Sequence, residues 1–412
     1  MVTKYDIFEF MYQNGSVLKP QEIVQAFKKS DSEYHTIYKI LLELKKNKWV
    51  AKTDHGFLIV RSTKTDQLYK IIKFCISNKI NYNELLEPKF ASFIYRAMSK
   101  NRFSINDFNL NPRTFSKYIE ILSKYGLLLI ISRKPLSAFI PYNSFLRDLA
   151  LFYGSAISVS KPNYDDYSPE IESELKRFRS LIKKNNRRYV EIMNEYEIKF
   201  IQHSLNLEGN PITLPDTIKL LKEQIIPKEL SVENVLEVQN YQKAVNQMIK
   251  DSFEKKLLTK ESMLNYHYLA MQHRPEIAGQ IRKVNVFIKG NPDFKIASPS
   301  EINMKLDSLL NKYEQFSTKK TTVKELLKFS AYFHNEFQHI HPFIDGNSRT
   351  TRLITFHLFC MKGFPMLDIP LGLLENYLFS TKGSRKREDK VLKSVLQSIL
   401  LYNLRTVNEK IK

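Results

Sequence analysis

The segment His341–Arg352, HPFIDGNSRTTR, gathers a histidine, a carboxylate, a Gly-Asn-Ser turn and two arginines within twelve residues. A histidine accepts a proton near neutral pH, and a carboxylate offers the hard oxygen that Mg²⁺ takes beside phosphate oxygens. Arginines three positions apart lie on one face of a helix, where they can grip phosphates in bidentate fashion. We therefore predict a nucleotide–Mg²⁺ site in which His341 is a general base and Asp345 holds the metal.

The turn inside this segment predicts an anion-binding helix start. Glycine permits a backbone geometry that lets phosphate approach closely, and free N–H groups with the helix dipole attract anions. Two arginines in the first turns oppose that dipole, which is poor for stability but suited to polyphosphate. The predicted nucleotide-binding residues are Gly346, Asn347, Ser348, Arg349 and Arg352.

A second interpretation of the same region is a zinc hydrolase, because His334, His339 and His341 lie close in sequence. Their spacing differs from H-E-x-x-H, in which two histidines share one face of a helix. The nucleotide site is therefore the favoured interpretation.

The elements that must position these groups are mainly helical. The 412 residues include only 11 glycines, and apolar residues recur at helical spacing along most of the chain. We predict a mainly α fold in five parts: 1–62, 66–160, 165–230, 231–372 and 373–412. The stretch 161–170, with two prolines, is expected to be a linker.

Two helix–hairpin patterns near the N-terminus suggest tandem winged helices, one in 1–62 and a similar one in 66–160. In the first, a helix over 32–47 would be the one that enters a DNA major groove. Winged helices also mediate protein contacts, so the choice between DNA and protein stays open. The residues expected to start that helix are Ser32, Tyr34, His35, Thr36 and Lys39.

Charge and composition bound the environment of the chain. The formal net charge of +21 favours acidic or phosphate-rich partners, although solvated lysines explain it equally well. The two cysteines, Cys75 and Cys360, predict no disulfide framework. No signal peptide or membrane-spanning run is evident, so we expect a cytoplasmic protein that does not enter membranes; a homodimer is left open.

The motif at 341–352 resembles the signature of the Fic family, H-x-F-x-[DE]-G-N-G-R-x-x-R. His341, Phe343, Asp345, Gly346, Asn347, Arg349 and Arg352 match it. Ser348 stands where the family usually has a second glycine; serine keeps the backbone N–H group and adds a hydroxyl.

The resemblance extends over about 165–370 and implies an all-α core with a short β-hairpin flap. The stretch 237–246 resembles a core helix, and 278–290 resembles the flap, which in the family holds the target segment as an added strand. The implied flap residues are Val286, Ile288, Lys289 and Gly290.

The stretch 203–217 resembles the family's inhibitory motif, [ST]-x-x-x-E-[GN], through Ser204, Glu208 and Gly209. By that resemblance Glu208 pairs with Arg352 and blocks productive ATP binding. Since this stretch precedes the core, the inhibition would be intramolecular.

Together these features predict a self-inhibited protein adenylyltransferase that moves AMP from ATP, with Mg²⁺, to a Ser, Thr or Tyr hydroxyl of a target protein. The same site removes AMP in some relatives. Two alternatives stay open: a Doc-like phosphotransferase, and a DNA-binding regulator whose Fic core is a ligand sensor.

Overall fold

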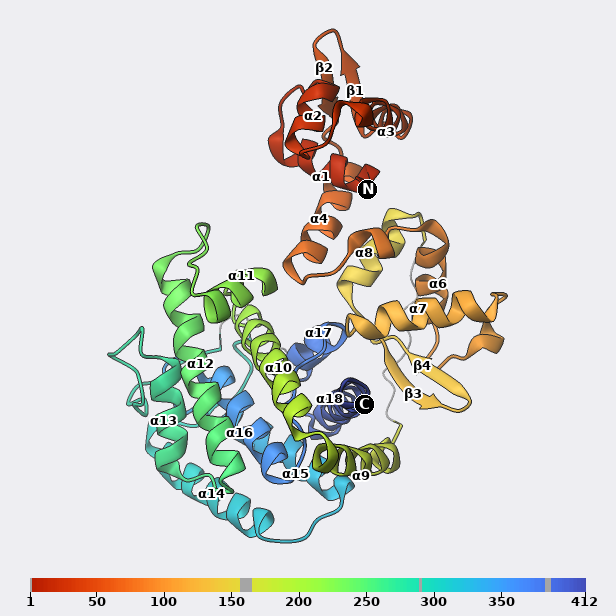
Figure 1. The fold of residues 1–412 in the computed structure, drawn as a ribbon. Coiled ribbons are helices and arrows are strands. Elements are labelled where there is room, and N and C mark those ends of the chain that lie inside the picture. Colours follow the sequence, from red (N-terminus) through yellow and green to blue (C-terminus); the bar gives the residue numbers. More distant parts are fainter. Residues whose placement is uncertain (1, 156–164, 289–290, 382–386) are drawn as a thin grey trace. The chain divides into compact units, whose positions relative to one another are not determined.

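A computed structural model describes residues 2–155, 165–288, 291–381 and 387–412. Helices dominate these residues, and the strands form two antiparallel two-stranded hairpins, which confirms the mainly α prediction (Figure 1). Within the described ranges, no helix has both the length and the apolar character that crossing a bilayer requires.

The chain divides into two compact units, Met1–Ser99 with Ser144–Ser158, and Lys100–Asn143 with Val159–Lys412. Residues 66–160, treated above as one module, contribute to both. The elements of the first unit are α1 (Lys4–Asn14), α2 (Pro20–Ala26), α3 (Tyr34–Lys46), β1 (Val50–Thr53), β2 (Gly56–Ile59), α4 (Thr63–Ser77), α5 (Tyr82–Leu85), α6 (Pro88–Met98) and α8 (Ser144–Phe152).

The start of the first unit has the element order expected for a winged helix: three helices followed by the hairpin β1–β2. A bridge between Leu18 and Phe57 ties the hairpin to the turn before α2. Gly56 is needed there, because a Cβ at this position would lie 2.6 Å from the Leu18 carbonyl oxygen. The assignment as a DNA-binding winged helix stays a prediction.

The second unit contains the region of the candidate site. Its helices and strands are α7 (Pro112–Lys124), β3 (Leu129–Arg133), β4 (Leu136–Phe139), α9 (Ser168–Lys184), α10 (Asn186–Asn206), α11 (Leu214–Ile218), α12 (Val232–Phe253), α13 (Lys260–Ala270), α14 (Ile302–Ser317), α15 (Val323–Ile340), α16 (Asn347–Met361), α17 (Leu374–Ser380) and α18 (Asp389–Ile411). The helices α9 and α10 are separate, since the backbone at Asn185 between them is non-helical (φ −143°, ψ 58°).

The hairpin β3–β4 belongs to the second unit because hydrogen bonds join the hairpin to α18, near the C-terminal end of that unit. Arg405 of α18 donates hydrogen bonds to the carbonyl oxygens of Ile130 and Ile131. Gly372 approaches the backbone of Gly126 so closely that a Cβ would lie 2.9 Å from the Gly126 carbonyl oxygen.

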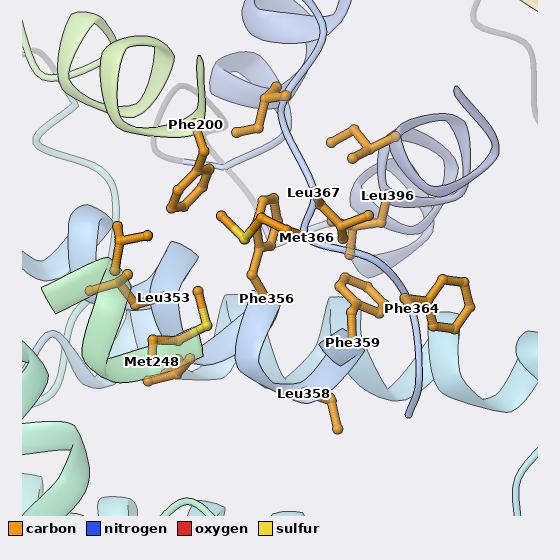
Figure 2. Packing of buried hydrophobic residues seen from close by; sticks show 14 of the residues in the cluster. Phe200, Met248, Leu353, Phe356, Leu358, Phe359, Phe364, Met366, Leu367 and Leu396 are labelled. Atoms are coloured by element: carbon orange, nitrogen blue, oxygen red, sulfur yellow. The ribbon is translucent and has the colours of Figure 1, made fainter. Parts of the chain in front are cut away.

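Helix α16 lies in the middle of the core and packs against α12, α13, α15 and α10. Figure 2 shows its Leu353, Phe356 and Phe359 among Phe200 of α10, Leu396 of α18 and other buried side chains. A helix that is apolar on all sides beyond its first turns is expected to be buried in this way. The packing fixes the position of its polar N-terminal end.

The expected β-hairpin over 278–290 is not formed as paired strands in the described residues, which end at Ile288 on this side. The segment 280–288 is irregular, and its alternating apolar residues face no partner strand; Phe287 is 83% exposed. Alternation indicates a half-buried strand only where another strand supplies the hydrogen bonds. Lys289 and Gly290 lie outside the described residues.

Candidate active site

His341 directly follows α15 and adopts a left-handed backbone conformation, with φ 48°. The conformation is uncommon for a residue with a side chain; here it turns the chain sharply out of the helix. The Nδ1–H group donates to the carbonyl oxygen of Gln338 at 3.2 Å. Because Nδ1 carries the proton, Nε2 has a free lone pair and is the basic nitrogen.

The environment keeps this imidazole neutral. Burial lowers the pKa of His341 to about 4, and the positive charge of Arg282 acts in the same direction. At neutral pH the ring is therefore able to accept a proton rather than already carrying one.

Helix α16 begins at Asn347, as predicted, with Gly346 in a left-handed conformation before it (φ 77°). A Cβ on Gly346 would lie 2.9 Å from Met271 Sδ, so glycine is also required by space. The first helical bond joins the Thr350 N–H group to the Gly346 carbonyl oxygen at 3.0 Å. The N–H groups of Asn347, Ser348 and Arg349 precede this bond and have no helical acceptor.

The side chain of Asn347 bonds the backbone of the loop that precedes α16. Its carbonyl oxygen accepts from the Phe343 N–H group at 2.9 Å, and its amide donates to the Phe343 carbonyl oxygen at 2.8 Å. The side chain thus clamps the loop, and only the backbone of Asn347 is available to an anion.

Arg349 is buried and held between two carboxylates. One guanidinium nitrogen pairs with Glu237 of α12, and the other donates to Asp345 Oδ1 at 3.2 Å. Glu237 was missed at the sequence level, although it begins the stretch 237–246 that resembled a core helix. An acid facing inward on an amphipathic helix was the available signal.

Asp345 lies at the mouth of the site, with its side chain 46% exposed. Its Oδ1 accepts from the Gly346 N–H group at 2.6 Å, and its Oδ2 accepts from Arg274 at 3.0 Å. Burial alone would raise the pKa of this carboxyl, but Arg349 and Arg274 hold it below its ordinary value. Asp345 is therefore ionised at neutral pH.

Arg352 is buried, with only 2% of its surface exposed. It contacts two of the three residues of the candidate inhibitory motif, Ser204 and Glu208. Its Nη1 lies 2.9 Å from Glu208 Oε1. Its Nε donates to Ser204 Oγ at 2.6 Å, and its Nη2 donates to the Ser204 carbonyl oxygen at 3.0 Å. Although burial alone would lower the pKa of Arg352, the Glu208 carboxylate raises it.

A turn after α10 presents Glu208 to the arginine. Gly209 has φ +97°, a conformation that favours glycine. Next to it, Asn210 donates to Glu237 Oε2 at 2.8 Å. The turn that carries Glu208 is thus bonded to the acid that holds Arg349, and both arginines are neutralised by connected parts of the chain.

The three histidines of the zinc interpretation do not gather. His334 Nε2 bonds the Tyr377 hydroxyl at 2.7 Å, and His339 Nδ1 bonds the Lys295 carbonyl oxygen at 2.6 Å. In the described part of the chain, no group of three or more His, Cys, Asp or Glu side chains is placed to hold a metal ion.

Of the predicted flap residues, Val286 and Ile288 are half-buried in the irregular segment before residue 289. The segment is attached to the site by Arg282, whose N–H group donates to the Pro342 carbonyl oxygen at 2.9 Å. The structure therefore brings the flap stretch beside His341, although not as a hairpin.

The chain is similar to known proteins over part of its length. Residues 257–359 match the model of the Fic/DOC family. "Protein adenylyltransferase Fic" of Drosophila persimilis is 27% identical over 178 residues, covering 43% of this chain and 34% of that protein. The protein of the same name from Drosophila erecta is 27% identical over 193 residues, covering 46% of this chain and 38% of that protein. The chain thus spans about a third of the length of these relatives.

Solved structures that match part of this chain include a Fic-domain-containing signaling protein from Bacteroides thetaiotaomicron, at a TM-score of 0.49 and 20% identity over 59% of this chain and 96% of that chain. Fic-1 from C. elegans has a TM-score of 0.46 and 20% identity, over 59% of this chain and 72% of that chain. The family match covers the loop 341–346 and most of α16. Residues 257–359 of this chain are thus similar to the Fic/DOC family.

Proposed function

We propose that the protein is a self-inhibited protein adenylyltransferase. The observation that carries this proposal is the N-terminal end of α16. There, two buried guanidinium groups lie one helical turn apart, Arg349 paired with Glu237 and Arg352 paired with Glu208. His341, with its basic Nε2, begins the loop that leads into this helix. The chain is similar to relatives named protein adenylyltransferases, which supports the choice of AMP as the transferred group.

In the proposed reaction, the triphosphate of ATP lies against the start of α16. Arg349 and Arg352 pair with phosphate oxygens, and the free N–H groups of residues 347–349 add hydrogen bonds. His341 Nε2 takes the proton from a target hydroxyl, and the resulting oxygen attacks the α-phosphorus. The bond from that phosphorus to the bridging oxygen of the β-phosphate breaks. AMP remains on the target, and pyrophosphate leaves.

Asp345 fits a role as Mg²⁺ ligand. Mg²⁺ in nucleotide sites commonly uses one or two carboxylates together with phosphate oxygens and water, and Asp345 is ionised and half-exposed. Its partner Arg274 is itself 38% exposed, so that ion pair is weak enough to exchange for a cation. Bound there, Mg²⁺ would neutralise charge on the phosphates.

Self-inhibition follows from competition for Arg352. The Glu208 carboxylate occupies a guanidinium edge that a phosphate of ATP would otherwise use. Displacing it leaves a buried cation that needs a new anion, and breaking such a pair costs about 3–5 kcal/mol. With Glu208 in place, ATP is held in a pose unsuited to transfer.

Replacing Glu208 with glycine should therefore raise AMP incorporation from ATP roughly tenfold or more, including into the protein itself. The measurement compares ATP labelled in the α-phosphate with ATP labelled in the γ-phosphate. Label from the α position is expected. Label from the γ position alone would instead identify the phosphotransferase alternative.

The matched control is Glu229→Gly, which removes an exposed acid from the same unit. It should leave incorporation at the level of the unchanged protein. Equal activity in Glu208→Gly and Glu229→Gly would reject Glu208 as the inhibitory group.

His341→Ala, made in the Glu208→Gly background, should abolish transfer while ATP affinity stays within about twofold. The reason is that His341 supplies the base and the arginines supply the phosphate contacts. Transfer rates and ATP binding by calorimetry measure the two effects. Retained transfer in the alanine variant would show that another group takes the proton.

The pH dependence of transfer should also be distinctive. Because His341 has a pKa of about 4, it stays neutral as the pH falls to about 5.5. The value of kcat/KM should then show no acid limb between about pH 5.5 and 8, whereas an ordinary histidine would lose half its activity near pH 6.5. An acid limb centred between pH 6 and 7 would contradict this assignment of the base.

We further propose that α3 of the first unit binds DNA. His35, Thr36 and Lys39 are exposed on one side of this helix, while Ile37 and Leu41 are buried on the other. Three helices followed by a hairpin place such a helix where it can enter a major groove. This activity would be additional to transfer.

Lys39→Glu should weaken binding to a duplex and reduce the slope of log affinity against log salt by about one, since one phosphate contact is lost. Fluorescence anisotropy over a salt series measures this. The control is Lys45→Glu, a change of the same size at an exposed position on another face of α3. Absence of salt-dependent binding by the unchanged protein would remove the DNA role.

A further inference from the structure

Two buried side chains outside the predicted site, Arg282 and His267, hold the catalytic loop 341–345 in place. Arg282 is only 2% exposed. Its Nε donates to the His341 carbonyl oxygen at 2.7 Å, and its backbone N–H group donates to the Pro342 carbonyl oxygen at 2.9 Å. One residue thus bonds two consecutive carbonyl groups of the loop.

The remaining nitrogens of Arg282 reach both ends of the flap segment. Nη1 donates to the Val284 carbonyl oxygen at 2.8 Å, and Nη2 donates to the Ala297 carbonyl oxygen at 2.5 Å. The guanidinium therefore joins three pieces of backbone: the loop at His341, the segment at Val284 and the chain after it at Ala297. A planar fork with five donors suits this arrangement.

Arg282 makes no ion pair among the residues that the structure describes, and burial lowers its pKa. Burying a cation without a carboxylate is unfavourable for stability. A packed apolar side chain would suit the core better, but it could not hold three carbonyl groups. The unfavourable burial of Arg282 indicates that this residue positions the loop rather than stabilises the fold.

His267 of α13 makes a second bridge between the same two segments. Its Nδ1 accepts from the Gly279 N–H group at 2.9 Å, so the ring proton is on Nε2. Nε2–H donates to the Asp345 carbonyl oxygen at 2.9 Å. The ring stacks on Phe343, with the centroids 3.6 Å apart and the planes at 5°.

Taken together, four carbonyl groups in this five-residue loop are held by side chains or by Arg282's own backbone. Arg282 bonds those of His341 and Pro342, Asn347 bonds that of Phe343, and His267 bonds that of Asp345. These bonds stabilise the left-handed backbone of His341 and set the direction of its ring.

We propose that Arg282 and His267 are positioning residues that couple residues 279–288 and Ala297 to the catalytic loop, so that His341 is aligned for proton transfer only while these contacts are made. The inference rests on the proposed transfer reaction. A target protein that contacts the exposed Val284 and Phe287 would act on a segment whose backbone is bonded to the residue that holds the base.

The test uses the Glu208→Gly full chain, with AMP incorporation into the protein itself as the assay. Arg282→Met should lower the rate at saturating ATP about 10–100-fold, because small misplacements of a catalytic group have effects of this size. The KM for ATP should stay within about twofold. Arg282→Lys should resemble Arg282→Met, since an ammonium group cannot span three carbonyl groups. The control Lys283→Met, which removes an adjacent exposed charge, should leave the rate unchanged.

Two conservative substitutions of His267 test separately its hydrogen bond to Gly279 and its hydrogen bond to Asp345. His267→Gln keeps a donor near the Nε2 position, and His267→Asn keeps an acceptor near the Nδ1 position. Each retains one end of the bridge, so both should lower the rate while preserving the KM for ATP. Full rates in both variants and in Arg282→Met would overturn the inference and leave the proposed function standing.

Hydrogen exchange gives a readout independent of activity. Arg282→Met should speed amide exchange in 341–347, with α12 and α18 unchanged. Unchanged exchange in the loop would overturn the inference, as would a uniform rise that marks a merely structural role. If Glu208→Gly itself transferred no AMP, the proposed function would fail, and the exchange experiment would still decide whether the coupling exists.

Discussion

The structure around the site depends on one electrostatic constraint: two guanidinium groups are buried at the positive end of a helix. Arg349 and Arg352 are repelled by the dipole of α16 and have little access to water. Each therefore needs an anion, and the protein supplies Glu237 and Glu208. The arrangement of α10 and α12 around α16 follows from this need, because each helix or its end delivers one carboxylate. A triphosphate satisfies the same need.

The proposed base, His341, is uncharged, unlike the two arginines. It is kept neutral by burial and by a neighbouring cation, and the Gln338 carbonyl fixes which nitrogen holds the proton. The candidate site thus combines permanently charged groups, proposed to bind phosphate, with one uncharged group, proposed to accept a proton. The two sets meet in a five-residue loop whose backbone has almost no freedom, since Asn347, Arg282 and His267 bond it from three directions.

The sequence predicted those parts that depend on local pattern. The start of α16 at Asn347 follows from Gly346 and the apolar residues after it, and the helix α7 begins at Pro112 as its sequence indicates. The paired strands expected for the flap do not appear among the described residues, and alternation of apolar residues alone cannot show whether a partner strand is present. Glu237, His267 and Arg282 were not identified as site residues, since their partners lie 59 to 112 positions away in the chain. Such contacts are set by packing, which single-residue patterns do not encode.

The bond between Asn210 and Glu237 has a consequence for control. It joins the turn that carries Glu208 to the acid that holds Arg349, so the environments of both arginines change as one thermodynamic unit. By reciprocity, an effector that loosened this turn would strengthen nucleotide binding by the same factor by which nucleotide strengthened effector binding. Regulation would then require no conformational change transmitted across the core, because the turn that carries Glu208 and the proposed nucleotide site are neighbours.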